Sequence, residues 1–218
     1  HYLDLGAAGF RCSSAYKVPP ELWRRLIGEV RQSHGHAVFL AAALGCPFEL
    51  VKGLAGCGFD LIFESSRWWD FHAPWYLEQQ EILRRIAPTV AFPEDHNTPR
   101  LAESFAVETP EEIERLYRAR YLLAAAVASG VLTVMGYEYG LRRRLDPIAT
   151  RPEDWHEGVE RRVDLTAFIG EVNAFKAKNP VLAAPFALHR VTAPNGRVVG
   201  CCASTRARRS PPSMRRSR

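Results

Sequence analysis

Short apolar runs alternate along the chain with stretches of helical periodicity. The run 37–44 is continuously apolar between two glycines, which is typical of a strand buried on both faces. Before it, apolar residues recur every three to four positions between Pro19 and Gly35, which predicts an amphipathic helix. The same two patterns predict strands at 8–12, 37–44, 59–63, 89–92 and 131–135, and helices at 19–35, 47–55, 74–86, 109–130 and 164–178.

This alternation predicts an α/β protein with a parallel sheet covered by helices. About five βα units are visible, whereas a closed eight-stranded barrel needs ~250 residues. We therefore expect residues 1–180 to supply about strands four to eight of a (β/α)8 TIM barrel. The start of a β-rich C-terminal domain is expected at 181–200, with a strand near 186–191. An open doubly wound sheet is the alternative, although the chain has no glycine-rich nucleotide-binding motif to support it.

The formal net charge of +5 comes from the C-terminal end of the chain. Six of the 29 Lys and Arg residues are arginines within 206–218, and without them 23 basic residues face 24 acidic ones, a balance of −1. Because 201–218 has almost no aliphatic residues, we expect a disordered, Arg-rich tail. A frameshifted reading frame fits this tail better than a nucleic-acid-binding arm. The chain begins with His1 rather than Met, so we also expect an N-terminally truncated fragment.

The remaining composition argues against membrane and secreted proteins. No apolar run reaches the ~18 residues of a membrane helix, and no signal peptide is visible. The five cysteines lack the dense, even pattern of a secreted scaffold and form no C-x-x-C pair, so reduced thiols and a cytoplasmic location are expected. No histidine or cysteine group has metal-ligand spacing, and we expect neither a metal nor a cofactor.

Polar side chains follow two of the predicted strands. Arg11, Ser13 and Ser14 come after the first strand, and Asp95 and His96 come after the fourth. The carboxyl ends of parallel strands lie at one edge of the sheet, where α/β proteins build their sites. An arginine with hydroxyl groups could bind an anion or a sugar there.

Two further groups have both a structural and a functional interpretation. Trp68 and Trp69 follow the third strand, and their flat rings could stack on sugars or simply pack within their loop. The run 142–144 is either a solvated loop or a phosphate-binding segment, since arginine suits phosphate geometry. Arg11 could likewise be a core arginine paired with Glu138 or Asp95.

Three strand ends resemble motifs of the α-amylase superfamily, glycoside hydrolase family 13. Residues 9–14 (GFRCSS) resemble its G-F-R-x-D-A motif, residues 38–44 (VFLAAAL) its V-F-L-A-E-x-L strand end, and residues 93–98 (PEDHNT) its x-x-N-H-D-T strand end. The motifs occur in the family order and cover roughly residues 1–180. The bacterial branch that extends α-1,4-glucan from maltose 1-phosphate, the maltosyltransferases, is the most similar.

The resemblance implies a retaining double displacement between two carboxyl groups about 5–5.5 Å apart, assisted by a third acid. On the motifs, the nucleophile position is Ser13, the acid/base position is Ala42 and the third-acid position is Asn97. All three carboxylates of the family are therefore replaced. Arg11 and His96, which in the family orient the nucleophile and bind sugar hydroxyls, are kept.

Further substrate contacts are expected around these positions. Asp95 precedes Asn97 by two residues, so it could face the same side, displaced by ~6.6 Å along the strand. A pair between Ser13 and His96 is the one remaining way to activate the nucleophile position. The expected substrate-binding residues are Arg11, Tyr16, Lys17, Trp68, Trp69, Asp95 and His96.

Without the three acids we expect an inactive or severely impaired carbohydrate-active domain, because a leaving group that departs unassisted typically forfeits ~10²–10⁴-fold in rate. The alternatives are a maltosyltransferase-like or amylase-like enzyme, an α-glucan-binding pseudoenzyme, and a non-functional truncated fragment. The expected ligand is an α-1,4-glucan or malto-oligosaccharide, with maltose 1-phosphate as the candidate donor. Neither nucleic acid nor membrane is expected as a partner. A homo-oligomer or a missing N-terminal half would cover the open barrel edges.

Overall fold

The computed structural model of the protein describes residues 1–155, 161–192 and 200–204. Its main sheet has five strands in the order β1-β2-β3-β4-β5, and every neighbouring pair is parallel. This chain-ordered arrangement belongs to part of a (β/α)8 barrel, since a doubly wound sheet reverses its strand order midway. The predicted partial barrel is therefore confirmed, and the doubly wound alternative is wrong. The strands are β1 (Gly9–Cys12), β2 (Val38–Ala41), β3 (Leu61–Phe63), β4 (Thr89–Ala91) and β5 (Gly130–Val131).

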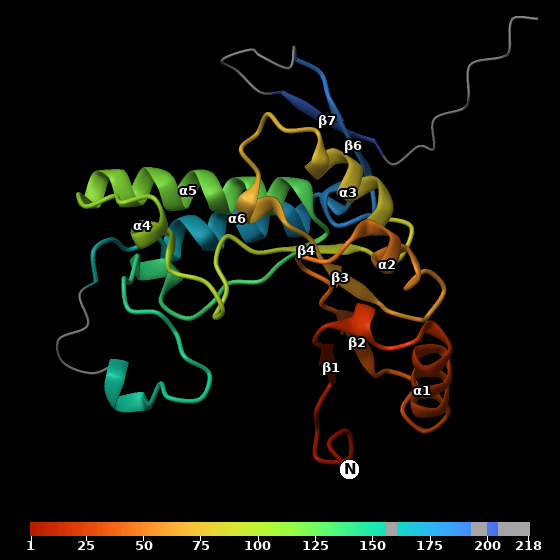
Figure 1. Ribbon diagram of the computed structural model, residues 1–218. Helices are drawn as coiled ribbons and strands as arrows, with labels where there is room; N and C mark the ends of the chain where they lie inside the picture. The colour runs from red at the N-terminus through yellow and green to blue at the C-terminus, as the bar shows by residue number, and fades with distance from the viewer. Residues whose placement is uncertain (156–160, 193–199, 205–218) are drawn as a thin grey trace, which may run out of the picture.

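Helices connect these strands (Figure 1). The longest, α5, begins where the sequence predicts, because Thr109 and Glu112 form a reciprocal capping box before an apolar run. The short helix α4 was not predicted, since four residues are too few to show a periodic pattern. The helices are α1 (Pro20–Ser33), α2 (Phe48–Lys52), α3 (Trp75–Leu83), α4 (Leu101–Ser104), α5 (Pro110–Val127) and α6 (Thr166–Lys178). None of the described helices is both long and apolar enough to cross a membrane.

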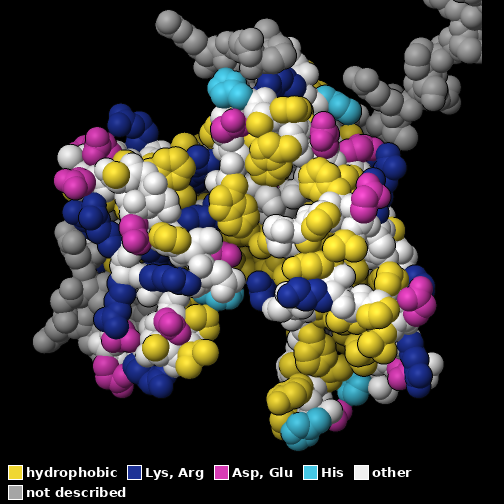
Figure 2. Space-filling view, viewed as in Figure 1, with side chains coloured by type: hydrophobic (Ala, Val, Ile, Leu, Met, Phe, Trp, Pro, Cys, Tyr) yellow, Lys and Arg dark blue, Asp and Glu magenta, His cyan; other side chains and the backbone are white. Residues whose placement is uncertain are grey.

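The two faces of the sheet bury different side chains. Phe39, Ala41 and Ile62 pack with residues of α1 and α2 on the outer face. Ala42 and Phe63 pack with apolar residues of β4 on the inner face, as the two-residue period of a strand requires. In Figure 1, α1 covers one side of β1 and β2. The other side faces a notch in Figure 2, and dark-blue cationic side chains lie on both sides of this notch.

The last strand of the barrel is shorter than predicted. Its apolar pattern runs over 131–135, but β5 ends at Val131, and the Leu132 amide makes a last bond to the Ala91 carbonyl. In the part of the chain that the structure describes, β5 pairs with β4 alone, so one edge of the apolar run has no ladder to hold it. The chain then turns at Gly136, whose φ of +87° suits glycine, into a 3-10 turn at Tyr137–Tyr139.

A second, two-stranded sheet follows the barrel. The predicted strand near 186–191 is confirmed as β6 (Ala187–Arg190), which contacts α3 (Figure 1). Its partner is the antiparallel strand β7 (Cys201–Ser204). The prediction that disorder begins at residue 201 is therefore wrong, because backbone pairing with β6 orders a segment that has few aliphatic residues. The rest of the predicted tail, 205–218, lies outside the described residues.

Candidate functional site

The ends of four barrel strands, β1 to β4, and the segment after β5 meet around a small cavity. Its volume is about 60 Å³. The predicted site residues Arg11, Asp95 and His96 form its polar lining, although Arg11 lies far from the other two in the sequence. Leu44, Phe63, Phe92 and Leu132 form the apolar lining.

Arg11 reaches the cavity from β1. Its Nη1 donates a hydrogen bond of 2.7 Å to Ser13 Oγ, and its guanidinium lies 5.4 Å from the centre of the Phe63 ring. Within the described ranges it forms no ion pair with Glu138 or Asp95, so the alternative of a core ion pair is not what the structure shows. Alternation along β1 places Arg11 and Ser13 on the inner face, opposite Cys12, which is buried on the outer face.

The nucleophile position has a cation as its neighbour. The Ser13 hydroxyl accepts a hydrogen bond from the Arg11 guanidinium. A guanidinium has no acceptor atom, so Arg11 cannot take the proton of this hydroxyl. Ala42, at the acid/base position, is buried in the inner apolar cluster and carries no titratable group. Ser13 thus accepts a hydrogen bond from a cation, and Ala42 offers only a methyl group to its surroundings.

The carboxylate of Asp95 organises its own turn. Its Oδ1 accepts bonds from the Asn97 amide (3.1 Å), the Thr98 amide (2.9 Å) and Thr98 Oγ1 (2.7 Å). Asp95 thus lines the cavity, as predicted, while one of its oxygens is engaged within the loop. Asn97 is exposed and is not part of the cavity lining.

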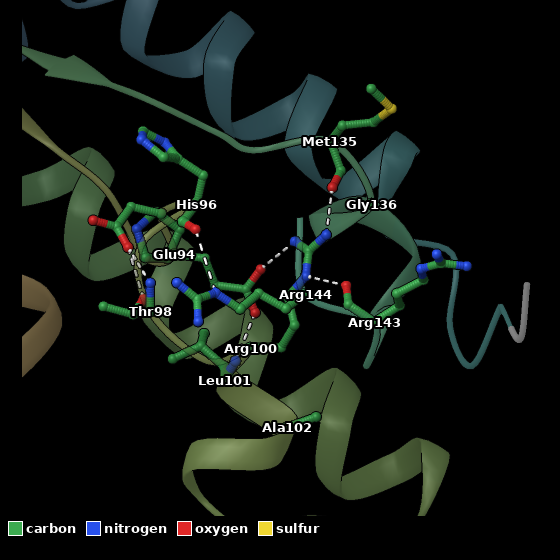
Figure 3. Close-up of polar contacts among 12 residues, drawn as sticks. Glu94, His96, Thr98, Arg100, Leu101, Ala102, Met135, Gly136, Arg143 and Arg144 are labelled. Atoms are coloured by element: carbon green, nitrogen blue, oxygen red, sulfur yellow. Dashed lines mark hydrogen bonds and ion pairs between the residues drawn. The ribbon is translucent and has the colours of Figure 1, made fainter. Parts of the chain in front are cut away.

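Arg144 binds main-chain carbonyl groups of this loop (Figure 3). Its Nη2 donates to the Asn97 carbonyl at 2.8 Å and its Nε to the His96 carbonyl at 3.4 Å. Arg143 forms an ion pair of 2.6 Å with Asp154, and Arg142 donates to the Val107 carbonyl. The three arginines are exposed, as expected of a solvated loop, and each of them also binds another segment of the chain.

A buried ion pair anchors the same loop to the protein (Figure 3). Glu94 and Arg100 are each 1% exposed, and Arg100 Nη1 lies 2.9 Å from Glu94 Oε2. Glu94 Oε1 also accepts from the Leu101 amide and the Tyr117 hydroxyl, while Arg100 donates to the carbonyls of Met135 and Arg143. The pair thus joins the segment after β4 to α5 and to the segment after β5. Neither residue was predicted from the sequence. The position of Glu94 shortly after β4 was the one signal available.

The two tryptophans have different environments. Trp68 is 47% exposed, and its ring meets Phe92 edge-on at 5.6 Å. Trp69 is 1% exposed, stacks on Tyr76 at 4.6 Å, and donates from Nε1 to the Ala73 carbonyl. The prediction that Trp69 stacks on a sugar is therefore wrong, because its ring faces are covered by the protein. Trp68 ends a 3-10 turn at Ser66–Trp68 and Trp69 follows it, and of the two only Trp68 exposes its ring.

Two predicted contacts lie beside the cavity rather than in it. Tyr16 and Lys17 belong to a 3-10 turn at Ala15–Lys17, and the Lys17 ammonium lies 5.9 Å from the centre of the Tyr16 ring. Neither residue contributes to the cavity lining. In the described part of the chain, no group of three or more His, Cys, Asp or Glu side chains is arranged to hold a metal ion.

The buried acid Glu64 was not predicted from the sequence either. Glu64 follows β3 directly and is inaccessible to solvent. Its carboxylate accepts from the Ser66 amide (2.8 Å) and from Gln80 Nε2 (3.1 Å), and Ser66 Oγ lies 2.5 Å from it. Burial raises the pKa of Glu64 to about 7, against the lowering effect of these hydrogen bonds.

Comparison with known proteins identifies similar chains. The alpha-1,4-glucan:maltose-1-phosphate maltosyltransferase of Burkholderia pseudomallei is 35% identical over 180 residues, covering 82% of this chain and 16% of that protein. The enzyme of the same name from Mycolicibacterium smegmatis is 26% identical over 199 residues, covering 83% of this chain and 27% of that protein. The chain thus spans about a sixth to a quarter of the curated relatives' lengths. No protein-family model matches the chain.

Solved structures show the same fold. An alpha-amylase from Lactobacillus plantarum superposes with a TM-score of 0.56 at 18% identity, covering 86% of this chain and 48% of that one. The cyclic alpha-maltosyl-(1→6)-maltose hydrolase of Arthrobacter globiformis, in complex with its cyclic sugar, gives 0.62 at 20% identity, with coverages of 88% and 45%. Together with the three strand-end motifs, these findings show that the chain resembles the maltosyltransferase branch of the α-amylase superfamily, glycoside hydrolase family 13.

Proposed function

We propose that this chain is an amylase-like domain that binds α-1,4-glucan at the strand ends without turning it over. One observation carries the proposal. The cavity brings together Arg11, Asp95 and His96, which can hydrogen-bond sugar hydroxyls, while Ser13, Ala42 and Asn97 carry no carboxyl group. Binding groups are therefore present at a site whose expected catalytic positions are all substituted.

The chemistry of the substituted positions supports binding over turnover. Ala42 cannot protonate a leaving oxygen, which typically costs ~10²–10⁴-fold in rate. Ser13 has Arg11 as its hydrogen-bond partner and so lacks a base to activate it. Asn97 is neutral and exposed, and offers no charge to stabilise an oxocarbenium-like transition state.

Asp95 does not replace the missing acids under this proposal. Its Oδ1 accepts three hydrogen bonds from the turn, so this oxygen is already engaged within the loop. Its second oxygen can still accept a hydrogen bond from a sugar hydroxyl. We therefore assign Asp95 to sugar binding, together with Arg11 and His96.

Isothermal titration with maltoheptaose tests this proposal. We expect measurable binding by the wild-type chain and an affinity lower by about tenfold or more for Arg11→Gln, because hydrogen bonds from a charged group contribute about 1.5–3 kcal/mol. The matched control is Arg25→Gln, which removes an equal charge from an exposed i,i+4 pair with Glu29 on α1. Absence of binding, or equal affinities for wild type and Arg11→Gln, would refute the proposed site.

A further inference from the structure

A larger pocket lies apart from the cavity at the strand ends. Its volume is about 400 Å³, within the ~300–1,000 Å³ typical of ligand sites. The walls come from the segment after β3, from residues 98–105 and from α5. Two buried arginines, Arg67 and Arg120, and two half-exposed aromatic rings, Trp68 and Phe105, line this pocket.

Arg67 is a buried cation whose partners are neutral. It is 7% exposed, and its Nη1 donates to the Pro93 carbonyl at 2.6 Å. Its Nη2 donates to the Pro99 carbonyl at 2.7 Å and lies 3.4 Å from Ser104 Oγ. These bonds fix the plane of the guanidinium. Among the described residues no carboxylate forms an ion pair with it, although, against the lowering effect of burial, the charges of Glu94 and Asp95 act to raise its pKa.

Arg120 approaches the pocket from the middle of α5. It is 9% exposed, and its Nη1 makes a long bond of 3.3 Å to the Trp69 carbonyl. Its guanidinium lies 5.2 Å from the centre of the Phe71 ring and 4.9 Å from that of Phe105. Over the described ranges Arg120, too, forms no ion pair with a carboxylate.

The two arginines make the pocket electropositive. Burial lowers the pKa of Arg67, and burial followed by the charge of Arg67 lowers the pKa of Arg120. The one carboxylate in the lining belongs to Asp70, which is exposed and accepts from the amides of His72 and Ala73. Two cations thus share a largely dehydrated wall, and an anion in the pocket would relieve their repulsion.

We propose that this pocket binds the phosphate group of a sugar phosphate between Arg67 and Arg120. Arginine forks match phosphate oxygens in geometry and charge. The rings of Trp68 and Phe105 offer flat apolar faces to the sugar that carries the phosphate. This site is separate from the proposed glucan site, because the two cavities have no lining residue in common.

Equilibrium dialysis with inorganic phosphate at constant ionic strength tests the anion. We expect wild type to bind phosphate and Arg120→Gln to bind it about tenfold or more weakly, because charge-assisted hydrogen bonds are lost. The control is Arg118→Gln, which removes an equal charge from α5 at an exposed pair with Glu114. Equal binding by wild type and Arg120→Gln, or no binding by wild type, overturns the proposal. If Arg120→Gln does not fold, Arg120→Lys keeps the charge without the fork, and weaker phosphate binding is again expected.

Titration with glucose 1-phosphate and with maltose tests the sugar. Glucose 1-phosphate should bind more tightly than inorganic phosphate, and Trp68→Ala should remove this difference. Maltose, which has no anion, should not compete for the pocket; competition equal to that of glucose 1-phosphate would contradict the assignment. Arg120→Gln should leave maltoheptaose binding unchanged, and Arg11→Gln should leave phosphate binding unchanged, so a failure at one site is distinguishable from a failure at the other.

Discussion

Glu94→Gln should lower the free energy of unfolding by about 3–5 kcal/mol, the usual cost of leaving one charge of a buried pair without its partner. Arg100 would keep its charge at 1% exposure, with carbonyl oxygens as its remaining partners. The Leu101 amide and the Tyr117 hydroxyl would also lose a charged acceptor. Urea denaturation followed by circular dichroism measures the loss.

The control for this experiment is Glu81→Gln. Glu81 pairs with Arg84 and Arg85 on the surface of α3, and exposed pairs contribute only ~0–1 kcal/mol. Adding Arg100→Met to Glu94→Gln should restore part of the stability, since the unpaired charge is then removed. A loss below about 1 kcal/mol for Glu94→Gln would show that the pair does not anchor the site loop.

Glu64→Gln should flatten the dependence of stability on pH between about 4.5 and 7. The pKa of Glu64 is raised from 4.5 to about 7 in the folded chain, so in this window the folded state holds a proton that the unfolded state has released. Wild-type stability therefore falls as pH rises through the window, by roughly 3 kcal/mol for a shift of this size. Glutamine is neutral throughout and has no such proton to lose.

Unfolding at pH 5 and at pH 8 measures the effect. Relative to Glu64→Gln, wild type should lose about 2.5 kcal/mol between these two pH values, because part of the unfolded chain is still protonated at this position at pH 5. Glu81→Gln serves as the control. Hydrogen bonds from Arg84 lower the pKa of Glu81, so the contribution of Glu81 to stability changes at acidic pH, below this window. Equal slopes for wild type and Glu64→Gln would mean that Glu64 is already ionised at pH 5.

The sequence predicts the fold best where local and tertiary signals agree. The capping box at Thr109 and Glu112 marks the start of α5 because the same residues that signal the helix also satisfy its first amides. The segment Cys201–Ser204 gave no such signal, since its strand exists through backbone bonds to β6 rather than through its own pattern. Strand β5 differs in the opposite way, because its apolar pattern covers more residues than its backbone pairing with β4.

The site was predictable where a motif lies directly at a strand end. Arg11, Asp95 and His96 do line one cavity. The sugar-stacking role predicted for Trp69 was wrong, because a sequence does not show which of two adjacent aromatic residues is buried. The contacts of Arg144 and Arg100 were not predicted, because their partners are mostly main-chain carbonyl groups that the fold brings close and that no residue type in the sequence indicates.

Under the proposed function, the chain binds α-glucan at a site that lacks catalytic carboxylates. The most direct test of this proposal is to incubate the protein with maltose 1-phosphate and maltoheptaose and to follow inorganic phosphate and oligosaccharide length by nuclear magnetic resonance. We predict that both sugars stay intact while titration shows maltoheptaose bound. Release of phosphate, or a change in oligosaccharide length, in proportion to the protein and abolished by Ser13→Ala would contradict this account.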